Sequence, residues 1–415
     1  MVTISPFKAL RPGAQYAKQV ASKPYDVLSS KEAKIEAQGN PNSFLHITKS
    51  EIDLPETVSP YSEAVYIKAK ENLDAFISRD ILFRENKECY YIYQLVMPGS
   101  EISNEHIQTG LVCCSSLKDY DENLIRKHEH TRPEKELDRI NHIKSTGAQT
   151  GNVFLAYRNN DALDAIVHDW KIEKNPVYDF VSDDKIRHSI WIVNDANIIN
   201  AITAIFSSDI SCTYIADGHH RAASAAKSRT NLKGSDVNLF LTTLFPSNQL
   251  QILDYNRVIK DLTGQTQEEF INRLMTKFSI TKKDKAVKPQ ALHHFGMYLN
   301  HQWYELELLH SISEPDPIRN LDVTILQDYI LAPILGINDQ RTDIRIDFIG
   351  GIRGLSELEK RVDSGEMAVA FSLYPVSISQ LFEVADRGEV MPPKSTWFEP
   401  KLRDGLLTHL ILKDQ

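Results

Sequence analysis

The sequence of 415 residues has few of the features that mark membrane-spanning, secreted or nucleic-acid-binding proteins. Its longest strongly apolar runs, such as residues 90–97, fall far short of the ~20 residues that a membrane span needs. Residues 1–8 contain no signal-peptide core. A net charge of -9 argues against nucleic-acid binding through the whole surface. We therefore expect a protein without a membrane or nucleic-acid partner.

Cysteine is also scarce, and the four cysteines lack the spacing of a metal site. Cys113 and Cys114 are adjacent, which favours a packed pair within a strand over a disulfide. A chain of this kind is typical of a reducing compartment, so we expect a cytoplasmic location. No internal repeat or low-complexity tract is evident.

What is present is typical of a globular protein with two domains, since 415 residues exceed one ordinary core. Strand-like and helix-like segments alternate, which predicts an α+β (mixed α/β) fold. The composition changes after about residue 262, so we expect an α/β domain at 1–262 and an α+β domain at 263–415. The end of the second domain, at 391–409, contains another polar cluster and could return to the active-site cleft of the first.

The periodicity of apolar residues and the turn signals predict individual elements. A helix should open at Ser59-Pro60 and bury Val65, Ala69, Leu73, Phe76 and Ile77. A capping box at 131–134 should begin a second helix that ends near Gly147. The other expected elements are strands at 88–97, 108–115, 152–157, 189–193 and 237–245, helices at 196–206 and 265–278, and a hairpin at 295–308.

The most informative segment is Asp217-Gly218-His219-His220-Arg221, which follows a β-rich run and precedes an alanine-rich one. This pattern predicts a strand, a tight turn and a helix, with Gly218 allowing a sharp bend and a close approach to a ligand. The first amides of a helix have no intrahelical partner and favour an anion. Two imidazoles and a guanidinium at the same point make phosphate the expected anion. A turn with a solvated basic cluster is the alternative.

Three further segments contain clusters of ionisable or hydroxyl side chains that could take part in binding or catalysis. Residues 127–133 contain Glu129 between His128 and His130, and could supply a base, a metal ligand or only a solvated loop. Residues 391–403 combine three basic residues and two hydroxyls with three prolines, which suits a preordered binding loop as well as a rigid surface tail. Residues 339–345 form a charged turn, expected to be solvated unless Arg341 or Arg345 faces inward.

Four segments, in this order, resemble a widespread bacterial and archaeal family known only as domain of unknown function 1015. They are residues 24–27, residues 126–139, residues 214–222, and residues 391–403 with Gly405 and His409. The Gly-x-x-Arg turn at a helix start is also similar to the nucleotide-phosphate turn of the ParB and sulfiredoxin superfamily. Sulfiredoxin has a cysteine in that turn and ParB adds a DNA-binding module, and this chain has neither. It is most similar to the free serine kinases, which keep an acidic residue before the glycine.

The resemblance implies a magnesium-assisted kinase that transfers a phosphoryl group from ATP, ADP or pyrophosphate to a small hydroxylated acceptor, expected to be free L-serine. Asp217 would hold Mg²⁺ or orient a histidine, and Glu129 would take the hydroxyl proton, with His128 or His130 near the transferred group. The remaining residues expected to bind the donor are Gly218, His219, His220, Arg221, Lys394, Ser395, Lys401 and Arg403.

Two other functions fit the same turn. A regulatory module would bind nucleotide without turnover, and a hydrolase would release phosphate with no amino acid present. The sequence shows no recognisable adenine pocket that would decide among the donors.

Overall fold

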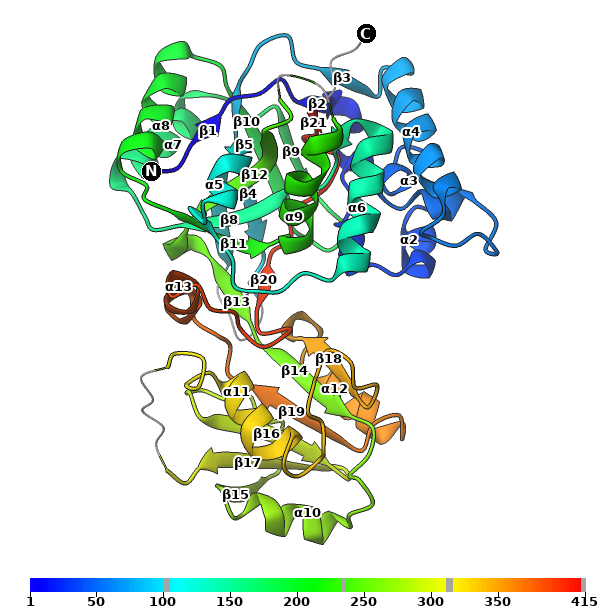
Figure 1. Cartoon of the computed structure of the whole chain (residues 1–415), viewed down its shortest axis with the longest axis vertical. Coiled ribbons are helices and arrows are strands. Elements are labelled where there is room, and N and C mark those ends of the chain that lie inside the picture. The colour runs from blue at the N-terminus through cyan, green and yellow to red at the C-terminus, as the bar shows by residue number, and fades with distance from the viewer. Residues whose placement is uncertain (100–104, 233, 235, 311–315, 412–415) are drawn as a thin grey trace. The chain divides into compact units, whose positions relative to one another are not determined.

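A computed structural model describes residues 1–99, 105–232, 234, 236–310 and 316–411, and these form two compact units (Figure 1). The first unit comprises Met1–Lys127, Thr131–Leu250 and Pro400–Gln415, and the second comprises His128–His130 and Gln251–Glu399. The second unit thus begins about a dozen residues before the expected boundary at 262. The segment after residue 400 belongs to the first unit.

The first unit is built on a nine-stranded mixed sheet in the order β6-β11-β8-β12-β5-β4-β10-β9, with β1 paired to β5. β8 and β12 are parallel, as are β6 and β11, and the other pairs are antiparallel. The five strands that the sequence predicted here are confirmed. The strands are β1 (Ile4–Ser5), β4 (Tyr90–Met97), β5 (His106–Ser116), β6 (Ile125–Arg126), β8 (Val153–Tyr157), β9 (Tyr178–Val181), β10 (Arg187–Val193), β11 (Thr213–Asp217) and β12 (Leu239–Pro246).

Helices and two small sheets complete the first unit. Its α-helices are α1 (Ala17–Val20), α2 (Ser30–Glu36), α3 (Leu45–Thr48), α4 (Glu63–Ser78), α5 (Leu117–Asp121), α6 (Pro133–Thr146), α7 (Asp161–Glu173), α8 (Ala196–Ser208) and α9 (His219–Ser228). The 3₁₀ turns are η1 (Ala14–Tyr16), η2 (Tyr25–Val27), η3 (Ser50–Asp53), η4 (Arg229–Asn231) and η5 (Ser247–Gln249). The small sheets pair β2 (Leu10–Pro12) with β3 (Leu82–Arg84), and β7 (Ala148–Gln149) with β21 (His409–Leu410).

The core of the first unit holds α9 in place beside the sheet. Ala222 and Ala225 of α9 pack in one apolar cluster with Ile215 of β11 and Leu244 of β12. The other side of α9 lies against α6, which in turn lies against α4 (Figure 1). Because alanine is small, the helix approaches the sheet closely, and its first turn is fixed at the end of β11.

Two predicted helix starts need correction. The helix α4 begins at Glu63 after Ser62, since Ser59 and Pro60 form a separate turn in which Ser62 N–H donates to the Ser59 carbonyl. Its buried face is as predicted except for Ile77, which is 37% exposed.

The predicted capping box is also wrong, because Arg132 is the N-cap of α6 and makes no side-chain capping bond. Thr131 instead donates its hydroxyl to Glu136, two residues beyond the expected partner. The helix does end at Gly147, whose φ of 66° is left-handed.

The second unit contains a six-stranded antiparallel sheet in the order β15-β17-β16-β19-β14-β18. Its strands are β14 (Tyr255–Ile259), β15 (Phe278–Lys283), β16 (His294–Leu299), β17 (Gln302–Leu308), β18 (Ile346–Gly350) and β19 (Val369–Leu373), and β13 (Gln251–Leu253) pairs separately with β20 (Trp397–Glu399). Its helical segments are α10 (Gln267–Leu274), α11 (Asp322–Leu326), the π-helix η6 (Gln327–Leu331), the 3₁₀ turn η7 (Gly351–Arg353), α12 (Leu355–Asp363) and α13 (Ile378–Asp386). The α+β fold class is therefore confirmed.

Two sequence predictions in the second unit are refined. The hairpin is confirmed with a two-residue turn, in which Asn300 and His301 have φ of 48° and 60° and Gln302 pairs with Leu299. The helix predicted at 265–278 is shorter, because Phe278 already pairs with Leu308 as the first residue of β15.

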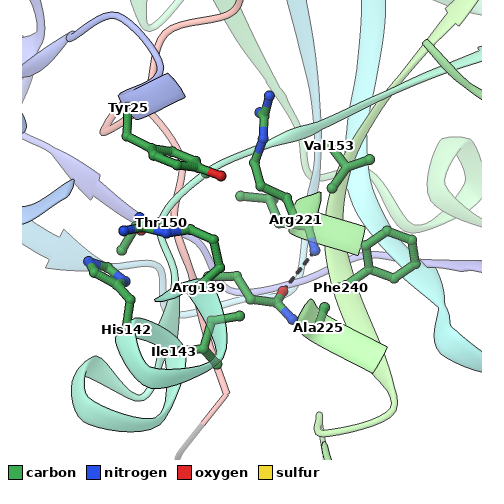
Figure 2. Close-up of a pocket in the computed structure, with 12 residues that line it drawn as sticks. Tyr25, Arg139, His142, Ile143, Thr150, Val153, Arg221, Ala225 and Phe240 are labelled. Atoms are coloured by element: carbon green, nitrogen blue, oxygen red, sulfur yellow. Dashed lines mark hydrogen bonds between the residues drawn. The ribbon is translucent and has the colours of Figure 1, made fainter. Parts of the chain in front are cut away.

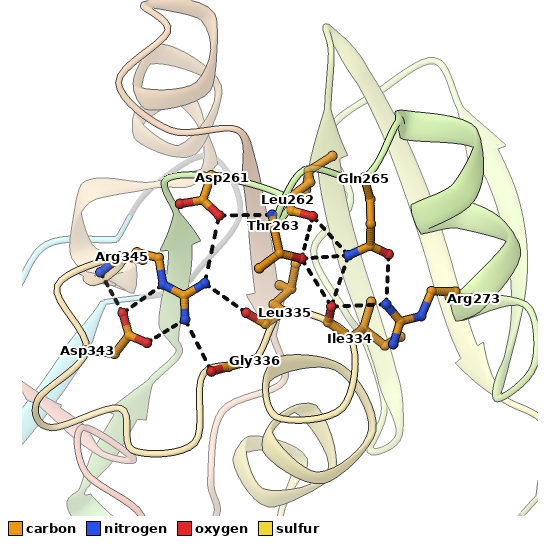
Figure 3. A network of polar contacts seen from close by, with 10 residues as sticks. All are labelled: Asp261, Leu262, Thr263, Gln265, Arg273, Ile334, Leu335, Gly336, Asp343 and Arg345. Carbon is orange, nitrogen blue, oxygen red and sulfur yellow. Dashed lines mark hydrogen bonds and ion pairs between the residues drawn. The ribbon is translucent and has the colours of Figure 1, made fainter.

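The charged turn at 339–345 is partly solvated and partly ordered. Arg341 pairs with Asp339 at the surface. Arg345 donates to the Leu335 carbonyl at 3.0 Å and the Gly336 carbonyl at 3.2 Å, and its ion pair with Asp343 completes the network in Figure 3. Arg345 therefore joins the loop after η6 to the start of β18.

Candidate functional site

The turn between β11 and α9 has the predicted geometry. β11 ends at Asp217, Gly218 is the N-cap with a φ of 98°, and α9 begins at His219. A Cβ on Gly218 would lie 3.1 Å from the Arg221 guanidinium carbon and 3.4 Å from the Val153 Cα. Glycine is required both for the left-handed backbone and for this close packing. Gly218 has no side chain to cap the helix, and the N-terminal end of α9 lies beside Asp217 and Arg221.

Arg221 folds back across the turn and is only 6% exposed at its side chain. It donates one Nη to the Asn152 carbonyl, and the other contacts Asp217 at 3.0 Å and Asp26 at 3.4 Å. Burial lowers the pKa of Arg221, but Asp26 and Asp217 raise it further, so the guanidinium stays charged. Arg221 was expected to hold phosphate directly. In the structure it is shared between two carboxylates beside a cavity.

Asp217 is more accessible than Arg221, with 28% of its side chain exposed. Its Oδ2 also lies 3.5 Å from Lys401 Nζ, which brings one residue of the predicted C-terminal loop to the turn. Burial would raise the pKa of Asp217, but Lys401 and Arg221 lower it more, so the pKa lies well below its usual value. Asp217 is therefore a firmly ionised carboxylate.

The two histidines of the turn differ in their surroundings. His219 is buried and close enough to Asp217 to lower the pKa of that carboxylate. His220 accepts a hydrogen bond at Nε2 from the Arg132 amide at 3.0 Å. A nitrogen that accepts from an amide carries no proton, so this imidazole is neutral in the structure. His220 therefore adds no positive charge to the turn in this state.

Arg403 does not join this group. It is buried and paired with Asp184, and it contacts the Ser182 hydroxyl at 3.5 Å. Arg403 therefore holds the 182–184 loop instead of facing the turn.

The other predicted site residues lie in the second unit. There the 128–130 segment meets the 391–396 loop, since the Met391 amide donates to the His128 carbonyl at 2.8 Å and Thr396 lies 3.5 Å from the imidazole. Lys394 has a φ of 57° and lies over the Tyr255 ring, at 5.8 Å from its centre.

Within the same loop of the second unit, Ser395 is buried and donates to the Pro392 carbonyl at 2.7 Å. Glu129 is partly exposed and His130 is exposed. The prediction that Glu129 and this loop share a cleft with Asp217 stays a prediction.

The structure adds residues that the sequence analysis missed. Tyr25 and Asp26 come from η2, and the Tyr25 ring lies 4.0 Å from the guanidinium carbon of Arg139 on α6. Burial raises the pKa of Tyr25, so its hydroxyl keeps its proton. Residues 24–27 and 126–139 both resemble family motifs, but the positions of Tyr25, Asp26 and Arg139 in the sequence indicate no chemical role.

Asp404 is the least expected of these residues, since it is charged but only 2% exposed. Neither carboxylate oxygen makes a hydrogen bond of normal geometry within the described residues, and the same is true of Nε of Arg221. Burial raises the pKa of Asp404 to about 7, although Arg221 lowers it. Only its place beside the predicted Arg403 could have drawn attention to it.

A small cavity of about 30 Å³, enough for a water molecule, adjoins Tyr25 and Arg221. In Figure 2 the Tyr25 hydroxyl points toward the Arg221 side chain across this space. The lining residues are Tyr25, Arg139, His142, Ile143, Gln149, Thr150, Gly151, Val153, Arg221, Ala225, Phe240 and Leu241.

Together these features define a mixed α+β protein with a charged, partly buried site at a strand–glycine–helix turn. The profile of DUF1015, described as a protein of unknown function, matches residues 4–324, and the chain belongs to this family. No curated protein matches the chain.

Three solved structures illustrate what the chain is similar to. A free serine kinase in complex with AMP has 12% identity and a TM-score of 0.37, covering 73% of this chain and 91% of that one. A conserved hypothetical protein from Pyrococcus furiosus has 14% identity and a TM-score of 0.37, with coverage of 75% and 97%. SbnI from Staphylococcus aureus, truncated at its C-terminus, has 10% identity and a TM-score of 0.38, with coverage of 71% and 85%.

Two further points concern the predicted setting. The relationship to the ParB and sulfiredoxin superfamily stays a prediction. Across the part of the chain that the structure describes, no helix is both long and apolar enough to cross a membrane.

Proposed function

We propose that this chain is a phosphotransferase that moves a phosphoryl group from ATP, ADP or pyrophosphate to the hydroxyl group of a small acceptor, with free L-serine as the expected acceptor. The observation that carries the proposal is the uncapped start of α9 at Gly218, next to Asp217, Arg221 and Lys401. Phosphoryl transfer asks a protein mainly to position two substrates and to neutralise charge, and this group of residues offers both.

The donor phosphates would bind to the first amides of α9, with Lys401 adding positive charge. Arg221 would support them from behind, because two carboxylates already hold its guanidinium. His219 would donate a hydrogen bond from a protonated ring nitrogen. These roles differ from the expectation that Arg221 itself binds the phosphate.

Magnesium fits the carboxylates of this site. Asp217 and Asp26 each turn Oδ2 to the same nitrogen of Arg221, so Mg²⁺ would be held by their remaining oxygens. Within the described residues no group of three or more His, Cys, Asp or Glu side chains is placed to hold a metal. Mg²⁺ commonly uses only one or two carboxylates together with substrate phosphates, so the two aspartates suffice. When bound, the ion would offset negative charge on the donor phosphates.

The test is a matrix of donors and acceptors. Purified protein with Mg²⁺ is incubated with ATP, ADP or pyrophosphate and each of a panel of free amino acids, and phosphorylated products are measured by mass spectrometry. O-phosphoserine formed with one donor supports the proposal. Phosphate release without any acceptor would instead identify a hydrolase. Tight nucleotide binding without turnover, measured by calorimetry, would identify a regulatory module.

A further inference from the structure

The backbone of Asp404 is fixed in the first unit, which makes the place of its side chain informative. Its amide donates to the Ser22 carbonyl at 2.9 Å, and the Ser22 amide donates back at 3.1 Å. Further along the chain, Thr408 forms the same reciprocal pair with Leu10. The main chain at Asp404 is thus fixed between two neighbouring segments, and its carboxyl group is buried there.

Polar atoms without hydrogen bonds surround this carboxyl group. Both oxygens of Asp404 and Nε of Arg221 are buried and make no hydrogen bond of normal geometry within the described residues, although the Asn152 amide lies near enough to lower the pKa of Asp404. The two side chains are neighbours: a point beside the Gly151 Cα, where a Cβ would lie, is 3.9 Å from Asp404 Oδ1 and 3.0 Å from Arg221 Cδ. Buried polar atoms almost always have partners. A group that accepts from Nε and donates to the carboxylate would satisfy both.

A hydroxyl group has that property, since it accepts and donates at one atom. An ammonium group cannot accept from a guanidinium, and a carboxylate cannot donate to Asp404. The alternative occupant is the water molecule that the adjoining cavity could hold. Water and a substrate hydroxyl offer the same bonds, so one can replace the other.

We propose that Asp404 contacts the acceptor hydroxyl and takes its proton during phosphoryl transfer, an inference that rests on the proposed function. The acceptor oxygen forms a bond to the terminal phosphorus of the donor. The bond from that phosphorus to the bridging oxygen breaks, and the rest of the donor leaves with the electron pair. The hydroxyl proton passes to a carboxylate oxygen of Asp404, while Nε–H of Arg221 orients the acceptor oxygen.

The charge around Asp404 suits a base at neutral pH. Burial raises its pKa to about 7, and a carboxylate in this range is a better proton acceptor than a solvated one. The charged and titratable groups that influence it come from four elements: Arg221 on α9, Asp26 on η2, Arg139 on α6 and Tyr93 on β4.

The first experiment is Asp404→Asn, which keeps the size of the side chain and removes the base. We expect turnover to fall by roughly 10²–10⁴-fold with nearly unchanged donor affinity. The matched control is Asp343→Asn, which alters a carboxylate of the second unit and should leave turnover unchanged. Normal turnover in Asp404→Asn would overturn the inference while leaving the proposed function intact.

The second experiment begins with a pH profile of the wild-type chain, which can be measured even if Asp404→Asn folds poorly. The profiles of two variants then assign the acid limb to one residue. The turnover of the wild-type chain should fall about tenfold per pH unit below about pH 7, because protonated Asp404 cannot act as a base. Asp404→Asn should lose this acid limb. If Glu129→Gln removes the limb and Asp404→Asn keeps it, Glu129 is the base and the inference fails. A wild-type chain that phosphorylates no acceptor would end the proposed function, and this inference with it.

Discussion

Two arginines of this chain, one in each unit, show how similar ion pairs serve different ends. Arg221 and Arg345 each lie between two aspartates and each donates to main-chain carbonyl groups. Every nitrogen of the Arg345 guanidinium has a partner, and its side chain is 27% exposed. Arg221 is buried, yet its Nε has none within the described residues.

The two networks differ in whether every polar atom has a hydrogen-bond partner. A satisfied and solvated network such as that of Arg345 contributes modestly to stability and needs nothing further. A buried network with unpaired atoms costs free energy unless something completes it. We infer that the Arg345 network serves the fold and that the Arg221 group serves a ligand.

The largest expected effect is the difference in stability between two single variants, Arg221→Ala and Arg345→Ala. Arg221→Ala should lower the free energy of unfolding by about 3 kcal/mol, the lower end for breaking a buried pair, because its partners Asp26 and Asp217 are partly exposed and Asp217 keeps Lys401. It should also weaken donor binding. Arg345→Ala should cost only about 1 kcal/mol, since water replaces its partners. Urea unfolding of both variants measures the contrast, and equal losses would remove the distinction.

The next effect is the pH dependence of stability that arises from Asp404 near Arg221 and from Asp343 near Arg345. Asp404 has a pKa of about 7 in the fold and about 4 when unfolded, so between these values the folded chain binds more protons. Its contribution to stability should therefore fall as pH rises from about 4 to about 7. The pKa of Asp343 is lowered by Arg345, so its contribution should instead be lost as pH falls through that lowered pKa.

Thermal unfolding across a pH range of about 4–8 measures this dependence. Asp404→Asn should flatten the slope and raise the melting temperature at the alkaline end of the range. Asp343→Asn should leave the slope near neutral pH unchanged. A steeper slope in Asp404→Asn would contradict the assignment.

A smaller effect separates two glycines with positive φ. Gly218→Ala should cost more than the ~1–2 kcal/mol of a left-handed alanine, because the new Cβ would also press on Arg221 at 3.1 Å. Gly336→Ala, beside Arg345, has a φ of 66° and nothing within 4 Å of the added Cβ, so only the backbone term applies. Unfolding in guanidinium chloride compares the two, and a greater loss at Gly336 would be the contrary result.

The smallest effect should come from the substitution of Arg341, because its ion pair with Asp339 lies at the surface. Arg341→Ala should leave the unfolding midpoint and donor affinity unchanged, as surface pairs usually do. A marked loss of donor affinity would show that the second unit takes part in binding through this turn.

Local sequence signals predicted what depends on neighbouring residues. The turn at 217–221 follows from glycine between a β-rich and an alanine-rich run, and Gly147 and the Asn300-His301 turn follow from similar local rules. The helix starts at 59 and 131 failed because several residues nearby could act as caps, and tertiary contacts selected among them.

Long-range contacts were beyond reach from the sequence. Asp26, Asp217 and Asp404 lie far apart along the chain, and only folding brings them to one guanidinium. Nothing in the local sequence marked Asp404 as buried or Arg403 as paired with Asp184. The motifs indicated which segments matter, whereas the charges that meet had to be seen in the structure.

The first unit is formed by chain segments that come before and after most of the second unit, and this order affects folding during translation. Its last contribution, from Pro400 onward, follows a second unit that begins at Gln251. At a ribosomal rate of about 5–20 residues per second, Lys401 and Asp404 emerge on the order of ten seconds after β12. Until then the strand β7 lacks β21 and the Arg221 group lacks two of its charges. The nascent chain thus lacks Lys401 and Asp404 beside Arg221 until translation has passed this point.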